Sequence, residues 1–199
     1  MEQEKINIYL VGDPCVGKTT FRDRFSESNV PLIYVCTFEL ETKEVDLKVG
    51  NQNYKLSLND IPGNENFSSS ALNKIDKPNA IIFMYDVNKE DTFKSIPKWI
   101  EKIKEKIERA CPFILIGNQI DKKERKIQTE EGKKFADDNY MDFFEISSKT
   151  GENEFDPMFF IIKRILNLPE KFSEPMIING YNLTEIALRN EKSCCYCCH

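Results

Sequence analysis

Short apolar runs alternate along the chain with longer segments in which apolar residues recur every three or four positions, a pattern typical of an α/β protein. The short runs predict six strands, at residues 5–11, 38–48, 53–59, 80–86, 112–117 and 142–146. Helices are expected at residues 18–27, 92–109, 129–139 and 154–167. The second of these carries one apolar stripe that should pack on the sheet, formed by Phe93, Ile96, Ile100, Ile103 and Ile107.

The connections between these runs indicate how the strands are arranged. Residues 49–53, Val-Gly-Asn-Gln-Asn, have the composition of a hairpin turn, so one edge of the sheet should be antiparallel. The helices between the other strands favour parallel crossovers. We therefore expect a doubly wound, mostly parallel six-stranded sheet in residues 1–168, with ligands at the carboxyl ends of its strands. Residues 169–199 have few periodic apolar positions and are expected to form a flexible tail.

Residues 12–19 read Gly-Asp-Pro-Cys-Val-Gly-Lys-Thr and fit the pattern G-x-x-x-x-G-K-[ST] without substitution. Because the motif lies between a predicted strand and a predicted helix, it indicates a phosphate-binding loop. Backbone N–H groups of such a loop surround the β-phosphate. Lys18 would place a cation on the β and γ oxygens, and the Thr19 hydroxyl would bind Mg²⁺.

Three further segments follow predicted strands, where this kind of sheet places its ligand. Residues 60–63, Asp-Ile-Pro-Gly, offer a carboxylate for Mg²⁺ through water and an N–H for a γ-phosphate, although the same residues also suit a common turn. Residues 118–121, Asn-Gln-Ile-Asp, offer a carboxylate that accepts two parallel N–H bonds from guanine, which adenine cannot donate. Residues 147–149, Ser-Ser-Lys, offer a backbone N–H for the guanine carbonyl. Together and in this order, the segments predict a guanine-nucleotide site.

On these four segments the chain resembles the Ras superfamily of small GTPases, and the Rab branch most closely, from residue 5 to about residue 168. Residues 83–87, Trp99 and residues 145–153 add to the resemblance. It implies the small G-protein fold of the P-loop NTPases, with GTP or GDP and Mg²⁺ bound. The nucleotide contacts that it implies are Asp13, Pro14, Cys15, Val16, Gly17, Lys18, Thr19, Thr20, Tyr34, Thr37, Gly63, Asn118, Gln119, Asp121, Ser147, Ser148 and Lys149.

The resemblance also implies a mechanism. Counting without gaps between Thr19 and Asp60 places Thr37 at the effector-loop threonine, so these three residues would hold Mg²⁺. The implied hydrolytic residues are Lys18, Thr37, Gly63 and Asn64. GTP would draw in the loops at about 28–38 and 61–76 and create an effector surface, and slow hydrolysis would release them. The implied partners are exchange factors, GTPase-activating proteins, effectors and a prenyl-binding escort. We expect a monomer at the cytoplasmic face of an intracellular membrane, cycling with the cytosol in vesicle traffic.

Several residues depart from the family pattern. Asn64 stands where a glutamine would orient the attacking water, and it is shorter by roughly 1.5 Å, so slow intrinsic hydrolysis is predicted. Pro14 removes one N–H of the loop, Gln119 lacks the usual lysine cation, and Val30 lacks the usual aromatic ring. The alternative is a hydrolysis-impaired, persistently GTP-bound effector-binding module of the same fold. An ATP-dependent P-loop enzyme is disfavoured by Asp121.

Composition narrows the list of partners. The net charge of −5 argues against nucleic acid as the main partner. No run of about 18 apolar residues is present, and residues 1–5 lack a signal-peptide core. Seven cysteines include four in the last six residues, where Cys197 and Cys198 look like a Rab geranylgeranylation signal. The alternatives are a zinc site formed by the four terminal cysteines with His199, and an unmodified tail.

Overall fold

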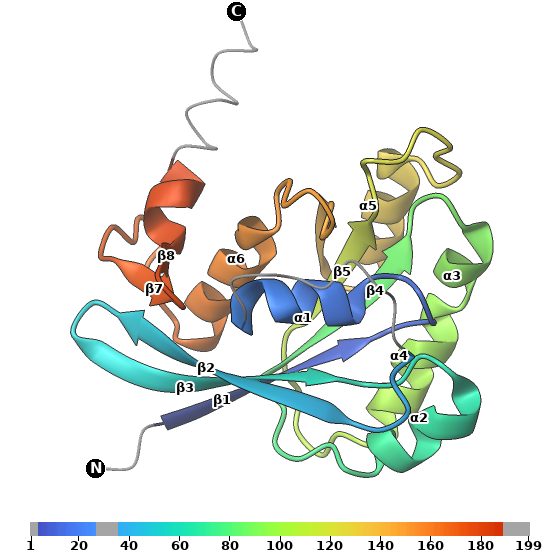
Figure 1. Cartoon of the computed structure of the whole chain (residues 1–199), viewed down its shortest axis with the longest axis horizontal. Helices are drawn as coiled ribbons and strands as arrows, with labels where there is room; N and C mark the ends of the chain where they lie inside the picture. The colour runs from blue at the N-terminus through green and yellow to red at the C-terminus, as the bar shows by residue number, and fades with distance from the viewer. Residues whose placement is uncertain (1–3, 27–35, 189–199) are drawn as a thin grey trace, which may run out of the picture.

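A computed structural model describes residues 4–26 and 36–188 of the 199-residue chain (Figure 1). The strands are β1 Glu4–Val11, β2 Glu41–Val49, β3 Gln52–Asp60, β4 Ala80–Asp86, β5 Phe113–Asn118, β6 Asp142–Ile146, β7 Met176–Ile178 and β8 Tyr181–Asn182. The helices are α1 Lys18–Ser26, α2 Glu65–Leu72, α3 Glu90–Lys94, α4 Ile96–Lys104, α5 Thr129–Asp138 and α6 Phe155–Ile165.

The strands form one sheet in the order β6-β5-β4-β1-β3-β2-β7-β8. The five strands from β6 to β3 are parallel to their neighbours, which confirms the doubly wound arrangement. Strand β2 pairs antiparallel with β3, with Val49 opposite Gln52 across the predicted hairpin. The parallel register sets Leu10 opposite Asp60, so the ends of β1 and β3 lie together. This end of the sheet is where the predicted ligand loops emerge.

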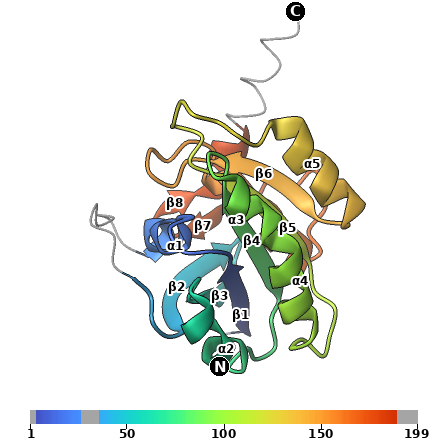
Figure 2. The same ribbon diagram turned by 90° about the vertical axis from the view of Figure 1, so that its right-hand side faces the viewer.

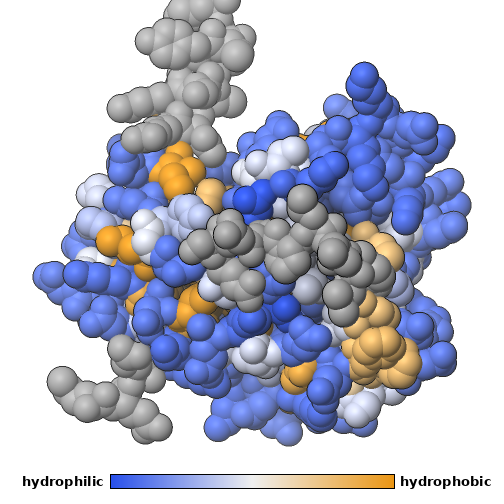
Figure 3. Space-filling view, viewed as in Figure 1, coloured by the Kyte–Doolittle hydropathy of each residue, from blue (hydrophilic) through white to orange (hydrophobic). Residues whose placement is uncertain are grey.

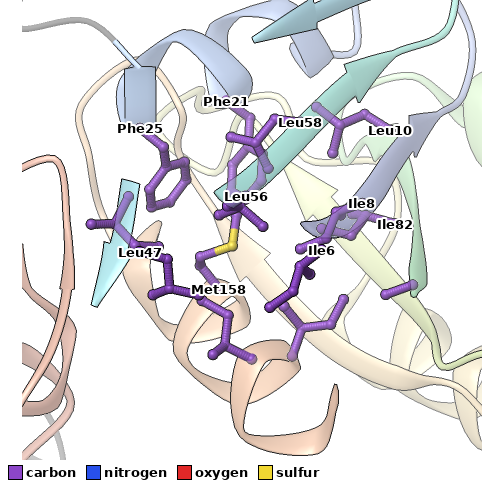
Figure 4. Packing of buried hydrophobic residues seen from close by; sticks show 14 of the residues in the cluster. Ile6, Ile8, Leu10, Phe21, Phe25, Leu47, Leu56, Leu58, Ile82 and Met158 are labelled. Carbon is purple, nitrogen blue, oxygen red and sulfur yellow. The ribbon is translucent and has the colours of Figure 1, made fainter. Parts of the chain in front are cut away.

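Helices cover both faces of the sheet (Figure 2). On one face, α1 and α6 pack on the sheet through buried side chains that include Phe21, Phe25 and Met158 (Figure 4). On the other face, α2, α3, α4 and α5 bury a second cluster that includes Phe93 and Trp99. Burying both faces explains why the central strands are apolar without alternation. The face seen in Figure 3 is mostly hydrophilic, with small separate hydrophobic areas.

Two predicted elements have different limits in the structure. The strand expected at residues 38–48 begins only at Glu41, and the helix expected at 92–109 is two helices that meet at Ser95 and end at Lys104. Pro97 lies in the first turn of α4, where its missing N–H costs no hydrogen bond, so the sequence favours a new helix start there. Helix α2 was not predicted from the sequence, because its eight residues carry little apolar periodicity.

The expectation of a flexible tail from residue 169 is wrong for residues 176–188, and the sheet therefore has eight strands instead of six. Strand β7 pairs with residues 47–49 of β2, and β8 folds back on β7. Residues 183–188 are helical. Met176, Ile178 and Leu183 are fully buried, so this segment completes the core. Asn179 and Gly180 have positive φ angles of 45° and 84°, the conformation of a tight hairpin that an Asn-Gly pair favours.

Among the described residues, none of the helices combines the length and the apolar character that crossing a membrane requires.

Candidate nucleotide-binding site

A cavity of about 560 Å³ lies at the carboxyl ends of β1, β3, β5 and β6, within the size range of small-ligand sites. Its walls come from the loop after β1, the start of α1, residues 36–37 and the loops that follow the other three strands. The lining residues are Pro14, Cys15, Gly17, Lys18, Thr19, Thr20, Cys36, Thr37, Gly63, Asn64, Asn118, Gln119, Asp121, Lys122, Ser148 and Lys149. All four predicted segments therefore contribute to one cavity.

The loop between β1 and α1 holds Lys18 at one end of this cavity. Lys18 Nζ donates hydrogen bonds to the carbonyl oxygens of Gly12 at 2.9 Å and Asp13 at 2.8 Å. Burial lowers the pKa of Lys18, and the negative charge of Asp60 opposes this shift. Gly17 has a φ of +97°, and a Cβ atom there would overlap the Asn118 side chain, so this position requires glycine. The backbone carbonyl groups thus hold the Lys18 ammonium at the end of the cavity where the motif predicts that phosphate binds.

The three residues predicted to bind Mg²⁺ lie together beside Lys18. Thr19 Oγ1 is 3.3 Å from Thr37 Oγ1 and donates to Asp60 Oδ2 at 2.5 Å. The other carboxylate oxygen, Asp60 Oδ1, is buried and has no hydrogen-bond partner in the described part of the chain. Burial raises the pKa of Asp60, against the effect of the Lys18 charge. Hydroxyl oxygens around an unsatisfied carboxylate oxygen suit a hard divalent cation, so these residues fit Mg²⁺.

The opposite end of the cavity is organised by one buried amide. Asn118 Nδ2 donates to the Val16 carbonyl at 2.8 Å, and Asn118 Oδ1 accepts from the Gln119 and Ser148 N–H groups at 2.8 and 3.0 Å. This side chain therefore joins the phosphate loop to the two loops predicted to bind guanine. The Asp121 carboxylate, which faces the cavity, accepts a 2.7 Å hydrogen bond from Ser147 Oγ. The bond orients the carboxylate proposed to recognise the base.

Asn64 lies at the other predicted switch segment and begins helix α2. Its Oδ1 accepts from the Asn66 N–H at 3.0 Å, which makes it the N-cap residue. A Cβ atom on the preceding Gly63 would overlap the Asp13 and Pro14 backbone, so this segment approaches the phosphate loop as closely as a glycine permits. The polar group expected to orient water is therefore engaged in capping a helix.

The sequence as a whole shows the family to which this chain belongs. The sequence matches the model of the Ras family over residues 7–167, which is most of the chain. The chain belongs to the Ras family. This Ras-family chain is a small GTPase, as the motifs and their order predict.

Individual relatives of this Ras-family chain include Rab proteins. It is 31% identical to Ras-related protein Rab-13 of Rattus norvegicus over 147 residues, 73% of the chain and 72% of that protein. It is 29% identical to Ras-related protein RABE1e of Arabidopsis thaliana over 199 residues, 96% of the chain and 91% of that protein. EF-hand calcium-binding domain-containing protein 4B of Homo sapiens is 28% identical over 189 residues. The match covers 94% of the chain but 25% of that protein, so the chain spans about a quarter of its length.

Most of the predicted nucleotide contacts line the cavity of this Ras-family chain, but three of those in the described part of the chain do not. Asp13 directs its side chain to Trp99, at 2.7 Å from the indole nitrogen. Val16 is buried and contributes its carbonyl to Asn118. Ser147 acts behind Asp121 and does not line the cavity. Five residues named in the predictions lie outside the described part of the chain, namely Val30, Tyr34, Cys197, Cys198 and His199.

A buried arginine of this Ras-family chain, Arg22, lies beside the predicted metal ligands and was not predicted from the sequence. Arg22 Nη1 lies 3.9 Å from Asp60 Oδ2 and donates to Glu41 Oε2 at 2.7 Å, while Arg22 Nε donates to Asp23 Oδ1 at 2.8 Å. Arg22 thereby ties α1 to the start of β2. An adjacent Arg-Asp pair between two buried phenylalanines, Phe21 and Phe25, is the signal that points to it. Cys36 and Lys122 also line the cavity without having been predicted.

Proposed function

We propose that the chain is a Rab-like switch in vesicle and membrane traffic, cycling between GTP-bound and GDP-bound states. The single observation that carries the proposal is the arrangement of charge in one cavity. The Asp121 carboxylate stands at one end for guanine, and Lys18 with the Thr19–Thr37–Asp60 cluster stands at the other end for phosphates and Mg²⁺. When bound, Mg²⁺ would neutralise charge on the terminal phosphate oxygens.

The switching elements are the two segments that carry Thr37 and Gly63. Both line the phosphate end of the cavity, and loss of a terminal phosphate removes what holds them together. On the outside, Phe38 is 61% exposed and its ring contacts that of Phe67 on α2, with ring centroids 5.2 Å apart. An aromatic pair that spans both segments and has one exposed ring supports recognition by effectors in one nucleotide state. Exchange factors and GTPase-activating proteins would act on the same surface.

Native mass spectrometry of the purified chain, combined with titration calorimetry, tests the proposal. We expect retained GDP or GTP and at least a hundredfold preference for guanine over adenine nucleotides, because adenine cannot donate two N–H bonds to Asp121. Protein that carries neither nucleotide and binds ATP as tightly as GTP would overturn it.

Slow intrinsic hydrolysis is the finer part of the proposal, and Asn64 supports it. We expect Asn64→Gln to raise the single-turnover rate of GTP hydrolysis by roughly ten- to a hundredfold, because the longer side chain carries the amide about 1.5 Å further. The variant would lose the helix cap and about 1 kcal/mol of unfolding free energy. Asn64→Asp is the matched control, because it keeps a capping oxygen but no N–H, and it should not be faster. An unchanged rate in Asn64→Gln would contradict the proposed role.

The second candidate is a persistently GTP-bound effector-binding module. The engaged Asn64 Oδ1 favours it, as does the missing N–H at Pro14. Single-turnover hydrolysis with activating proteins that carry a catalytic arginine separates the two functions. Acceleration by any of them supports the switch, and retained GTP with all of them supports the module.

Membrane attachment is proposed to depend on lipid. Cys197 and Cys198 would carry prenyl groups, and an escort protein would cover these groups in the cytosol. Nine residues along the chain lead from Leu188 to Cys197, and a chain of that length spans at most roughly 30 Å, so the domain would lie within that distance of the bilayer.

We expect Cys197→Ser with Cys198→Ser to lower the membrane-bound fraction in cells about tenfold or more, since stable anchoring requires two attachments. The matched control is Cys194→Ser with Cys195→Ser, which should keep the prenyl adducts in intact-protein mass spectra. Membrane binding that survives the first pair and fails with the second would place the anchor elsewhere.

A further inference from the structure

Trp99 makes a polar contact with the phosphate loop that its place in the core does not require. It lies on α4, is 3% exposed and is the single tryptophan of the chain. Its indole N–H donates to Asp13 Oδ1 at 2.7 Å. A phenylalanine would fill the same apolar cluster without this bond. What the indole adds is therefore a hydrogen bond from the second face of the sheet to a carboxylate of the phosphate loop.

Asp13 joins two contacts within one residue. Its side chain accepts from Trp99, and its backbone carbonyl accepts from Lys18 Nζ at 2.8 Å. A shift of Asp13 would therefore move an acceptor of the buried cation at the phosphate end of the cavity. The following residue, Pro14, lines that cavity and has no N–H through which the backbone could be anchored. The hydrogen bond from Trp99 instead anchors the loop through the side chain of Asp13, the residue immediately before Pro14.

Helix α4 also holds the second switch segment. Lys98 and Lys102 both pair with Glu65, which directly follows Asn64. Lys102 Nζ in turn lies 4.8 Å from the centre of the Trp99 ring. Both contacts line one smaller cavity of about 500 Å³, whose wall includes Asp13 with Trp99 and Glu65 with Lys98. One helix thus contacts both the phosphate loop and the start of α2.

We propose that Trp99 is a positioning residue for the nucleotide site, acting through Asp13 to hold the phosphate loop around Lys18. The inference rests on the proposed guanine-nucleotide function and adds a residue that touches neither nucleotide nor metal. Its consequence is kinetic. A loop held by α4 keeps its shape when phosphate contacts loosen, so nucleotide leaves more slowly and hydrolysis proceeds from a fixed geometry.

The test compares Trp99→Phe, Asp13→Ala and their double variant with wild type, using the full chain. Asp13→Asn separates the hydrogen bond from the charge, because its amide oxygen still accepts from the indole. We expect the first two variants to raise the dissociation rate of a fluorescent GDP analogue about tenfold each, and Asp13→Asn to raise it less than Asp13→Ala does. The double variant should resemble either single variant, since both remove the same bond. Trp99 emission should respond to GDP in wild type and far less in Asp13→Ala.

The outcomes separate this inference from the function on which it rests. A wild type that binds no guanine nucleotide overturns both. A wild type that binds GDP, with variants that lower the melting temperature but release GDP at the wild-type rate, overturns the positioning role alone. Additive effects in the double variant would do the same, because they would show that Trp99 and Asp13 act independently.

Discussion

Replacing Asp121 with asparagine is expected to convert a guanine site into a xanthine site. Guanine presents two N–H donors, at N1 and the exocyclic amine, to the carboxylate. Asparagine offers one acceptor and one donor, which match the N1–H and the C2 carbonyl of xanthine. GTP affinity should fall by about a thousandfold or more, because a buried donor would face a donor. XTP affinity should rise correspondingly in a competition assay with a fluorescent nucleotide.

The contact behind Asp121 provides the control. Ser147→Ala removes the 2.7 Å hydrogen bond that orients the carboxylate but leaves both of its oxygens. We expect about a tenfold loss of GTP affinity with no gain for XTP, which separates orientation from recognition. If Asp121→Asn still prefers GTP and stays folded by circular dichroism, the carboxylate does not read the base.

The parts of this site that were predictable are those that sequence order determines. A phosphate-loop motif after β1, and polar segments after β3, β5 and β6, reach one cavity because parallel strands place their carboxyl ends at one edge of the sheet. The resemblance to the Ras superfamily, with ungapped counting between two of these segments, implied that Thr37 joins Thr19 and Asp60, and the three side chains do lie together.

The missed parts depend on contacts between residues far apart in the chain. Strand β7 has three residues and becomes a strand by pairing with residues 47–49, so local periodicity shows little of it. Helix α2 depends on the Asn64 cap and on packing of Leu72. The Arg22 contact and the bond from Trp99 to Asp13 follow from tertiary placement, which sequence spacing does not report.

Replacing Lys18 with methionine is expected to abolish tight nucleotide binding while leaving the folded chain intact. The ammonium is buried and points at two carbonyl oxygens, so its loss removes a buried, charge-assisted contact to phosphate. We expect GDP affinity to fall by about a thousandfold, in line with truncation of one partner of a buried charge pair. Without nucleotide the variant should be no less stable than wild type, because burial already penalises the lysine charge.

Thermal unfolding with and without GDP measures both effects at once. At a GDP concentration about a thousand times the wild-type dissociation constant, bound nucleotide should add about 4 kcal/mol to wild-type stability and about 0.4 kcal/mol to Lys18→Met. Lys122 is the matched control, because it lines the same cavity with a side chain 49% exposed and pairs with Asp86 at 3.7 Å. Lys122→Met should keep most of the stabilisation. If both variants lose the stabilisation by GDP equally, the cavity responds only to its total positive charge, and Lys18 has no specific role in binding phosphate.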